Sequence, residues 1–368
     1  MPLGRKKINT ILTATLMGLL LAGPPAWAEE NPDEKTKQSQ AVTLATIKVT
    51  AEKREASAQE VPISITAVSK ETVQDAQVWS TKDLVHLVPN LFLLKTANHS
   101  SDGFLAIRGI TSWMGGEPTV GFYVDDVFYS NYDLELLDVE RIEVLRGPQG
   151  TLYGRNTEAG VVNVVSAQPA KKRWEGMASV MAGNYNTQVY RAHVTGPVVD
   201  DKLFIRLAAK QTLSDGYFTN TFRDDDSVDD LNDFGGRLTA LWTPSDAWEI
   251  KFGSELLRYR DGYAAFAPLE RLNQNPHDVS VDYDGHADYD AATQRLHIKY
   301  KGSYFNATAI TAYRNEETDD SNDLDFTAMD LMRMDMDVDT DLFSQEIRFT
   351  SPDEGSAFTW LAGLYFFN

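Results

Sequence analysis

Side chains in the C-terminal half of the chain alternate between apolar and charged residues, as the two faces of an extended strand do. In the segment 202–211, one face carries Leu203, Ile205, Leu207 and Ala209, and the other carries Phe204, Arg206 and Lys210. The segment 294–301 repeats this period of two. Such segments approach the roughly 9 to 11 residues of a tilted membrane strand, and no stretch after the N-terminus has the roughly 18 apolar residues of a membrane helix. The pattern predicts transmembrane β-strands with their apolar face outward.

The connections between these strands alternate in length. Short turns are expected at 198–202, 243–247 and 301–303, and long acidic loops at 214–233, 260–292 and 316–341. We count about nine strands, and the last covers residues 358–367. An odd, open set of strands leaves its edges unpaired in lipid. Residues 171–368 are therefore expected to form the N-terminal portion of a larger antiparallel β-barrel.

Residues 61–170 have the pattern of a smaller mixed α/β domain. Strands are expected at 61–68, 104–110, 120–127, 141–145 and 161–165. Ser69 begins a helix that reaches about residue 76, and Ser80 begins a second helix with Asp83 as its capping-box partner. The predicted fold class is a mixed α/β domain followed by an antiparallel transmembrane β-barrel.

The segment 139–166 within this domain holds five glycines or prolines between two apolar runs. It is not a phosphate-binding loop, because the run after Gly160 is a strand and no helix N-terminus is available to face an anion. Its charged residues lie beside segments apolar enough to be buried, and buried charges need partners. The chain has no cysteine and no Ser/His/Asp arrangement at a credible spacing, so we expect no catalytic site and no enzyme activity.

The first 28 residues have the form of a secretory signal peptide. A basic start at Arg5, Lys6 and Lys7 precedes an apolar core, and small residues end the segment at Ala28. Cleavage there removes three basic residues and no acid, which takes the formal charge from −20 to −23. Such acidity argues against a nucleic-acid partner, whose affinity comes mainly from lysine and arginine.

Residues 29–60 are expected to form an exported tail. Its first part is polar and lacks apolar periodicity, but the run 45–51 is β-prone without a neighbouring strand in the sequence. One interpretation is a loose edge strand. The other is a peptide that adds itself to the sheet edge of another protein through main-chain hydrogen bonds. The pattern alone favours neither.

Three motifs together resemble those of the TonB-dependent outer-membrane receptors. They are Ile107-Arg108-Gly109, Tyr123-Val124-Asp125, and the run from Glu140 to Gly154, ERIEVLRGPQGTLYG, followed by Asn163. The amino-acid sequence of the segment 146–166 is most similar to that of ferric-siderophore receptors of the yersiniabactin/pesticin type. The resemblance implies that residues 61–170 are a plug inside a barrel of 22 strands. About nine of those strands are present here.

The resemblance also implies partners and site residues. Thr46, Ile47, Lys48, Val49, Thr50 and Ala51 match the TonB box, which pairs with the periplasmic domain of TonB, itself energised by ExbB and ExbD. Arg108, Glu143 and Arg146 match plug charges that meet charges on the barrel wall; the alternative for them is ion pairs inside the plug. Trp113 and Met114 are candidate contacts to the substrate, or they pack on the wall.

The implied function is energy-coupled import of a ferric siderophore across the outer membrane, in contact with its lipid and lipopolysaccharide. Cobalamin, haem or a carbohydrate are alternative substrates, and a truncated receptor without transport activity is a further alternative. The short distance between Ala28 and Thr46 leaves no room for an additional signalling domain. No cofactor is implied.

Acidic residues crowd the segment 316–341. They are Asp319, Asp320, Asp323, Asp325, Asp330, Asp335, Asp337, Asp339 and Asp341. Carboxylates suit calcium, but no EF-hand spacing is present, and we favour a solvated acidic loop. His277 and His286 also lie among aspartates, and there too we favour a polar loop. No metal site is predicted.

Overall fold

The computed structural model describes residues 47–50, 52–94, 104–112, 117–132, 134–263, 266–273, 275–352 and 358–368. They belong to one compact unit, Thr46–Asn368. The predicted signal peptide at 1–28 lies outside the described residues, as do Thr46, Ala51, Trp113 and Met114. Among the described residues, no helix has the length and apolarity to cross a bilayer.

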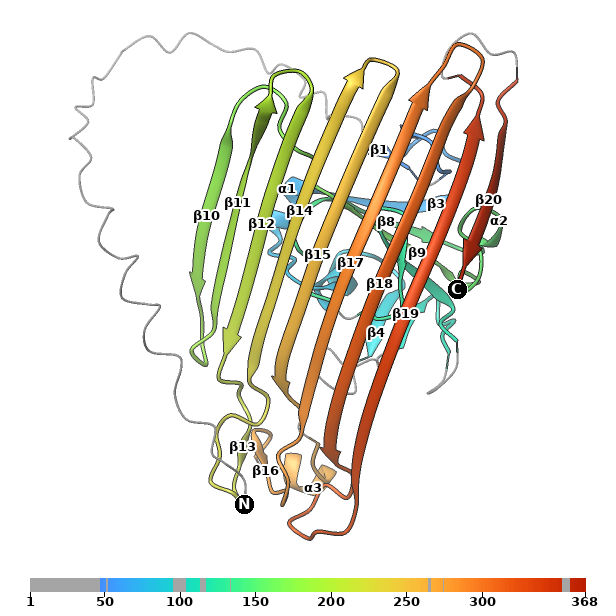
Figure 1. Cartoon of the computed structure of the whole chain (residues 1–368). Coiled ribbons are helices and arrows are strands. Elements are labelled where there is room, and N and C mark those ends of the chain that lie inside the picture. The colour runs from blue at the N-terminus through green and yellow to red at the C-terminus, as the bar shows by residue number, and fades with distance from the viewer. Residues whose placement is uncertain are drawn as a thin grey trace, which may run out of the picture. The chain divides into compact units, whose positions relative to one another are not determined.

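Nine strands form one antiparallel sheet in chain order, which confirms the predicted number for the described part of the chain (Figure 1). They are β10 (Glu175–Ala182), β11 (Gln188–Val199), β12 (Leu203–Ser214), β14 (Leu231–Ser245), β15 (Trp248–Gly262), β17 (His286–Lys301), β18 (Asn306–Asp323), β19 (Arg333–Thr350) and β20 (Leu361–Phe367). The short turns lie near the predicted positions, between β11 and β12, β14 and β15, and β17 and β18.

The two faces of this sheet have the polarity that the sequence predicts. On β12, Leu207 is 51% exposed, whereas Arg206 and Lys210 are 5% and 3% exposed. On β17, Leu296 is 36% exposed and Arg295 is 3% exposed. The apolar face is therefore the open one, and the charged face is covered by the rest of the chain. This is the inside-out arrangement of a membrane barrel filled by protein.

The predicted loop at 316–341 is wrong in extent. Strands β18 and β19 stay paired in register out to Asp323↔Arg333, so the connection shrinks to residues 324–332. The aspartates between Asp335 and Asp341 alternate with methionine, valine and threonine, which keeps the period of a strand. The aspartates of β19 in this range are exposed, so their charges stay solvated while the backbone remains paired.

The long connections carry small elements of their own. Strand β13 (Thr219–Asn220) pairs in parallel with β16 (Asp278–Val279), which joins the loop after β12 to the loop after β15. A single helical turn, α3 (Leu269–Leu272), precedes β16. These elements lie together at one end of the sheet (Figure 1).

The α/β domain contains a five-stranded sheet in the order β3-β8-β9-β6-β7. Its strands are β3 (Ser64–Ser69), β6 (Val120–Val124), β7 (Val127–Tyr129), β8 (Val139–Arg146) and β9 (Gly160–Ser166). Two separate strand pairs, β1 (Lys48–Val49) with β2 (Ala56–Ser57) and β4 (Leu91–Leu94) with β5 (Phe104–Ile107), complete it. All five predicted strands of this domain are present, although the segment 120–127 turns back at Asp125 and Asp126 to give two strands.

Both predicted helix starts are confirmed. Helix α1 (Lys70–Asp75) begins after Ser69, whose Oγ accepts the backbone N–H of Thr72 at 3.3 Å. The second helix, η1 (Thr81–His86), is a 3₁₀ helix, and the Ser80 N–H donates to Asp83 Oδ2 at 2.9 Å. A four-residue helix, α2 (Gly150–Tyr153), occupies the glycine-rich segment between β8 and β9.

The main core runs from the small domain into the large sheet. Ile142, Val144 and Val162, on the central strands β8 and β9, are completely buried. Their cluster includes Tyr259 and Tyr289, on the inner face of the large sheet. The small domain therefore packs on the charged face of the sheet.

Candidate functional site

The described part of the predicted TonB box, Ile47 to Thr50, is docked on the small domain. Lys48 and Val49 pair with β2, and the Ala58 N–H donates to the Ile47 carbonyl at 3.0 Å. The Val49 side chain is fully buried in a cluster with Leu145 and other residues of the domain. A segment predicted to bind another sheet edge is thus already part of a strand pair.

Glu143 holds the end of this segment. Its Oε1 accepts the Thr50 N–H at 2.9 Å and the Thr50 hydroxyl at 3.1 Å, and it also accepts Arg141 Nε at 2.8 Å. Asn163 Nδ2 donates to Oε2 at 3.4 Å. Glu143 is completely buried, and its charge is satisfied by the backbone N–H and hydroxyl of Thr50, the Asn163 amide and the Arg141 guanidinium.

These contacts agree with the alternative expectation for Glu143, an ion pair inside the plug. Its ion pair among the described residues is with Arg141, inside the small domain, and a pair with the barrel wall stays a prediction. The physical reason is its position on β8, between β3 and β9, where its neighbours in register are Ala67 and Asn163. Among the described residues, the hydrogen bonds of that side chain all lie within the tail and the small domain.

Arg146 also makes its described contacts within the small domain. Its guanidinium donates to the Pro89 carbonyl at 3.1 Å, to Ser64 Oγ at 3.3 Å and to Thr66 Oγ1. Arg108 is exposed, with φ at 55°. Burial and the positive charge of Arg108 lower the pKa of Arg146. In the part of the chain that the structure describes, neither arginine has an ion pair, so their pairing with a barrel carboxylate stays a prediction.

Other residues anchor the domain to the large sheet. Arg206 binds Asp138 through two parallel hydrogen bonds, Nε to Oδ2 and Nη2 to Oδ1, both at 2.5 Å. Lys210 pairs with Glu135 and donates to the Trp79 carbonyl at 2.7 Å. The alternation of β12 identified the two basic residues as inward-facing, but nothing in the sequence marked Glu135 and Asp138 as their partners.

A second group of contacts lies around Tyr129. Its hydroxyl donates to Glu255 Oε1 at 2.7 Å, and Arg314 lies over its ring at 3.7 Å from the centroid. Burial and the Glu255 carboxylate raise the pKa of Tyr129 to about 12. Glu255 also binds Arg237. The neutral phenol of Tyr129, from the small domain, thus hydrogen-bonds to a network of charged residues on the inner face of the sheet.

Asp125, four residues before Tyr129, adds a charged contact. Arg295 Nη1 lies 3.4 Å from Asp125 Oδ2, and both side chains are at most 5% exposed. Burial alone raises the pKa of Asp125, but Arg295 and further basic residues outweigh burial and hold it below its ordinary value. Asp125 is therefore charged and paired across the interface.

The residues after the docked tail also reach the large sheet. Lys53 Nζ lies 2.8 Å from Asp126 Oδ1, 3.8 Å from Glu346 Oε2 on β19, and 4.2 Å from the centre of the Tyr153 ring. Arg54 Nη2 donates to the Trp360 carbonyl at 2.6 Å. The tail is held on the domain at Thr50 and on the sheet three to four residues later.

The two histidines considered as metal ligands lie apart: His277 is in the long connection after β15, and His286 is the first residue of β17. His286 Nε2 is 3.2 Å from Asp319 Oδ1, and His277 packs against the Tyr217 ring at 5.7 Å. Within the described ranges, neither belongs to a cluster of three groups that could hold a metal ion.

Comparisons with known proteins identify the smaller domain and relatives of the chain. Residues 57–161 match the model of the TonB-dependent Receptor Plug Domain. The pesticin receptor of Yersinia pestis is 30% identical over 254 residues, which cover 67% of this chain and 36% of the receptor. The ferrioxamine B receptor of Salmonella typhimurium strain SL1344 is 25% identical over 228 residues, which cover 60% of this chain and 31% of the receptor. The chain thus spans about a third of the length of these relatives.

The fold as a whole has a match among solved structures. The ferric yersiniabactin uptake receptor from Yersinia pestis superposes with a TM-score of 0.76 at 23% sequence identity, over 82% of this chain and 48% of that one. The match covers the small domain together with the large sheet. Residues 57–161 therefore belong to the plug domain family of the TonB-dependent receptors, and the nine-stranded antiparallel sheet that follows them has the fold of the barrel of such a receptor.

Proposed function

We propose that the chain provides the plug and nine barrel strands of an outer-membrane receptor that imports a ferric siderophore, with energy supplied through TonB and the ExbB/ExbD complex. The names of two similar proteins, a ferrioxamine B receptor and a ferric yersiniabactin uptake receptor, favour a siderophore, and vitamin B12 transporters among the relatives make cobalamin the first alternative. The function is transport and not catalysis.

The observation that carries this proposal is the docking of Ile47 to Thr50. The segment is held by a two-residue strand pair, by one buried side chain and by Glu143. These contacts are few enough to be exchanged for pairing with the sheet edge of a partner, in which main-chain hydrogen bonds supply the affinity. The segment thus fits the TonB box that its sequence resembles.

The contacts between plug and sheet suit a plug that must move. Asp138, Glu135 and Asp125 meet basic residues of the sheet. When the plug shifts, water can hydrate both members of each pair, which offsets part of the cost of separating them. A ligand bound at the outer side would change the state of the tail, and a pull on the tail would then open a path beside the plug.

Proline substitutions in the box test the coupling. Ile47→Pro and Val49→Pro remove a backbone N–H and fix φ, so a partner strand can no longer pair fully. We expect uptake of radiolabelled ferric siderophore by whole cells to be abolished while binding of the ligand at the surface persists. Lys48→Ala, at a side chain that is 73% exposed, is the matched control and should transport normally. Normal uptake in both proline variants would contradict the coupling.

Growth on defined iron chelates tests the substrate class. We expect cells with the gene to grow on at least one ferric siderophore on which cells without it do not. If the gene makes no difference to growth on any iron source but does on cobalamin, haem or a carbohydrate, that compound is the substrate instead of a siderophore. Surface binding without any uptake by the wild type would favour the receptor without transport activity.

A further inference from the structure

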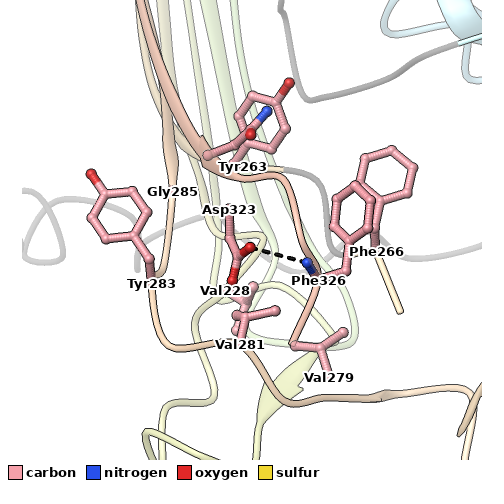
Figure 2. Close-up of a pocket in the computed structure, with 10 residues that line it drawn as sticks. Val228, Tyr263, Phe266, Val279, Val281, Tyr283, Gly285, Asp323 and Phe326 are labelled. Carbon is pink, nitrogen blue, oxygen red and sulfur yellow. Dashed lines mark hydrogen bonds between the residues drawn. The ribbon is translucent and has the colours of Figure 1, made fainter. Parts of the chain in front are cut away.

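A small cavity lies between the connections that follow β12, β15 and β18, at the end of β18 (Figure 2). Its volume is about 20 Å³, and most of its lining is apolar, including Val228, Val279, Phe266 and Phe326. Asp323 also lines it, and its carboxylate points into the space between these side chains (Figure 2). Room for about one water-sized particle beside a carboxylate in apolar surroundings requires a polar occupant or a counter-charge.

Asp323 has one satisfied and one unsatisfied oxygen. The residue is 7% exposed. Its Oδ1 accepts the backbone N–H groups of Asp325 and Phe326 at 2.9 and 3.0 Å, and its Oδ2 is buried without a hydrogen-bond partner in the described structure. Asn322, which also lines the cavity and is 4% exposed, has an equally unpartnered Oδ1. Two buried acceptor oxygens therefore lack a donor or a cation at the same place.

The carboxylates of Asp282 and Asp325 lie close to that of Asp323. Oxygen atoms of Asp282, Asp323 and Asp325 all lie within 4.8 Å of one another. The Asp282 N–H donates to the Thr327 carbonyl at 3.1 Å, which fixes the loop after β16 against the loop after β18. The arrangement thus brings together three acids from two loops.

The positive charge nearby is smaller than the negative charge. Arg333 Nη2 donates to Asp282 Oδ2 at 3.2 Å and lies 3.6 Å from Asp330 Oδ1. Its side chain is 41% exposed, and its contact with Asp282 leaves the other oxygen of that carboxylate available. One guanidinium shared between two acids does not balance the cluster of three, so the cluster attracts a further cation.

We propose that Asp282, Asp323 and Asp325 bind a calcium ion that joins the two loops. All three ligands are carboxylates, which suit hard cations and not zinc, whose sites are built mainly from histidine and cysteine. Calcium sits at about 2.3 to 2.6 Å from its oxygen ligands, so oxygens on opposite sides of one ion are about 5 Å apart, in line with the span of the cluster. Asn322 Oδ1 and water complete its irregular coordination better than the strict octahedron of magnesium.

This site is independent of the transport proposal, because it rests on loop residues alone. It revises the interpretation of the acidic segment as a purely solvated loop. Asp325 Oδ1 accepts the Thr327 N–H at 3.1 Å, and its Oδ2 accepts the N–H groups of Leu331 and Met332 at 3.2 and 3.1 Å. The connection after β18 is therefore folded around the Asp325 carboxylate, and an ion that binds there replaces some of these hydrogen bonds.

Terbium luminescence tests the site in the full chain, purified in detergent and stripped of metal. Terbium replaces calcium and is excited through nearby phenols, and Tyr263 and Tyr283 line the cavity. We expect saturable emission that calcium abolishes and that magnesium displaces at least tenfold more weakly. Asp323→Asn keeps an oxygen for the turn hydrogen bonds and removes the charge, and it should weaken terbium binding at least tenfold.

Asp339→Asn is the matched control. It removes an exposed aspartate from β19, in the same hairpin but outside the cluster, and should leave the emission unchanged. Absence of saturable emission from the wild type, or equal emission from Asp323→Asn, would overturn the site. Equal displacement by magnesium would overturn the assignment to calcium. Matching far-ultraviolet circular dichroism of the three proteins excludes misfolding as the cause of a loss.

Discussion

The backbone N–H of Thr50 donates to the completely buried carboxylate of Glu143 at 2.9 Å, across 93 residues of sequence. Thr50 is the last described residue of the predicted TonB box, and Glu143 lies on a central strand of the plug sheet. The state of the tail is therefore linked directly to the interior of the plug. A change that alters the charge of Glu143 should alter how firmly the tail is held.

Glu143→Gln tests this link. The amide keeps one acceptor for Thr50 but leaves Arg141 without its charged partner, and such losses cost about 1 to 3 kcal/mol. We expect a spin label at Lys48→Cys to become markedly more mobile, and labelling is specific because the chain has no other cysteine. Glu140→Gln, on the same strand at a side chain that is 45% exposed, should leave the label unchanged. Equal mobility in both variants would refute the link.

Asp138→Asn should destabilise the plug in the barrel. Arg206 is 5% exposed, and the substitution leaves its guanidinium buried without a counter-charge, which costs about 3 to 5 kcal/mol. The measurement is urea unfolding of the plug, followed by a fluorophore at a single plug cysteine.

A double-mutant cycle identifies the cause of that loss. Adding Arg206→Met removes the unpaired charge, so the double variant should be more stable than Asp138→Asn alone. Glu175→Gln, which breaks an exposed pair with Arg173, should change little. Additive losses in the cycle would show that Asp138 and Arg206 act independently.

Tyr129→Phe should change the alkaline stability of the plug. The pKa of Tyr129 is raised to about 12, whereas an unfolded tyrosine titrates near about 10. The contribution of the protonated phenol is therefore fully present below about pH 10 and is lost as the pH rises towards about 12. Plug stability of the variant should fall less steeply over that window than that of the wild type. Tyr304→Phe, at a side chain that is 89% exposed, should follow the wild type. A steeper fall in Tyr129→Phe would contradict the assignment.

Gly160→Ala should prevent the plug from packing normally. Gly160 opens β9 with φ at 155°, and a Cβ there would lie 2.2 Å from the carbonyl oxygen of Leu145 and 2.8 Å from Ile107 Cδ1. Because the nearer atom is backbone of the neighbouring strand, the contact cannot be relieved by a rotamer change, and we expect a loss of about 3 kcal/mol or more. Gly150→Ala, where a Cβ meets nothing within 4 Å, is the control. Equal urea midpoints for the two variants would refute the explanation.

The fold was largely predictable because its two patterns are local. A period of two identified the strands and their inward faces, and serine caps located the helices of the plug. Strand ends at the outer side were missed because the charged segment around Asp335 keeps the strand period while its composition is that of a loop. The acidic composition of this segment predicts exposure to solvent, but its pairing register with β18 determines that it is a strand.

The candidate site was predictable only in part, because its contacts join distant segments. The segment Ile47 to Thr50 is singled out by its resemblance to a family motif, but the sequence leaves its present partner, Glu143, open between the barrel wall and the plug. Nothing local distinguishes a carboxylate that faces a tail from one that faces a wall. In the same way, the pairing of Asp138 with Arg206 depends on how the plug packs against the sheet. The residue pattern within one segment cannot predict that packing.

The geometry of the β1–β2 pair has a mechanical consequence. The strands are antiparallel, and Ile47 and Ala58 lie together at their open end. A pulling force on Ile47 therefore breaks the hydrogen bonds between β1 and β2 one after another. It does not load all of them at the same time. The separation would stop at Thr50, where the load passes into the plug through Glu143, and then at Lys53 and Arg54, where it passes into the wall. Opening the β1–β2 pair would thus need little force, and releasing Thr50, Lys53 and Arg54 afterwards would need more.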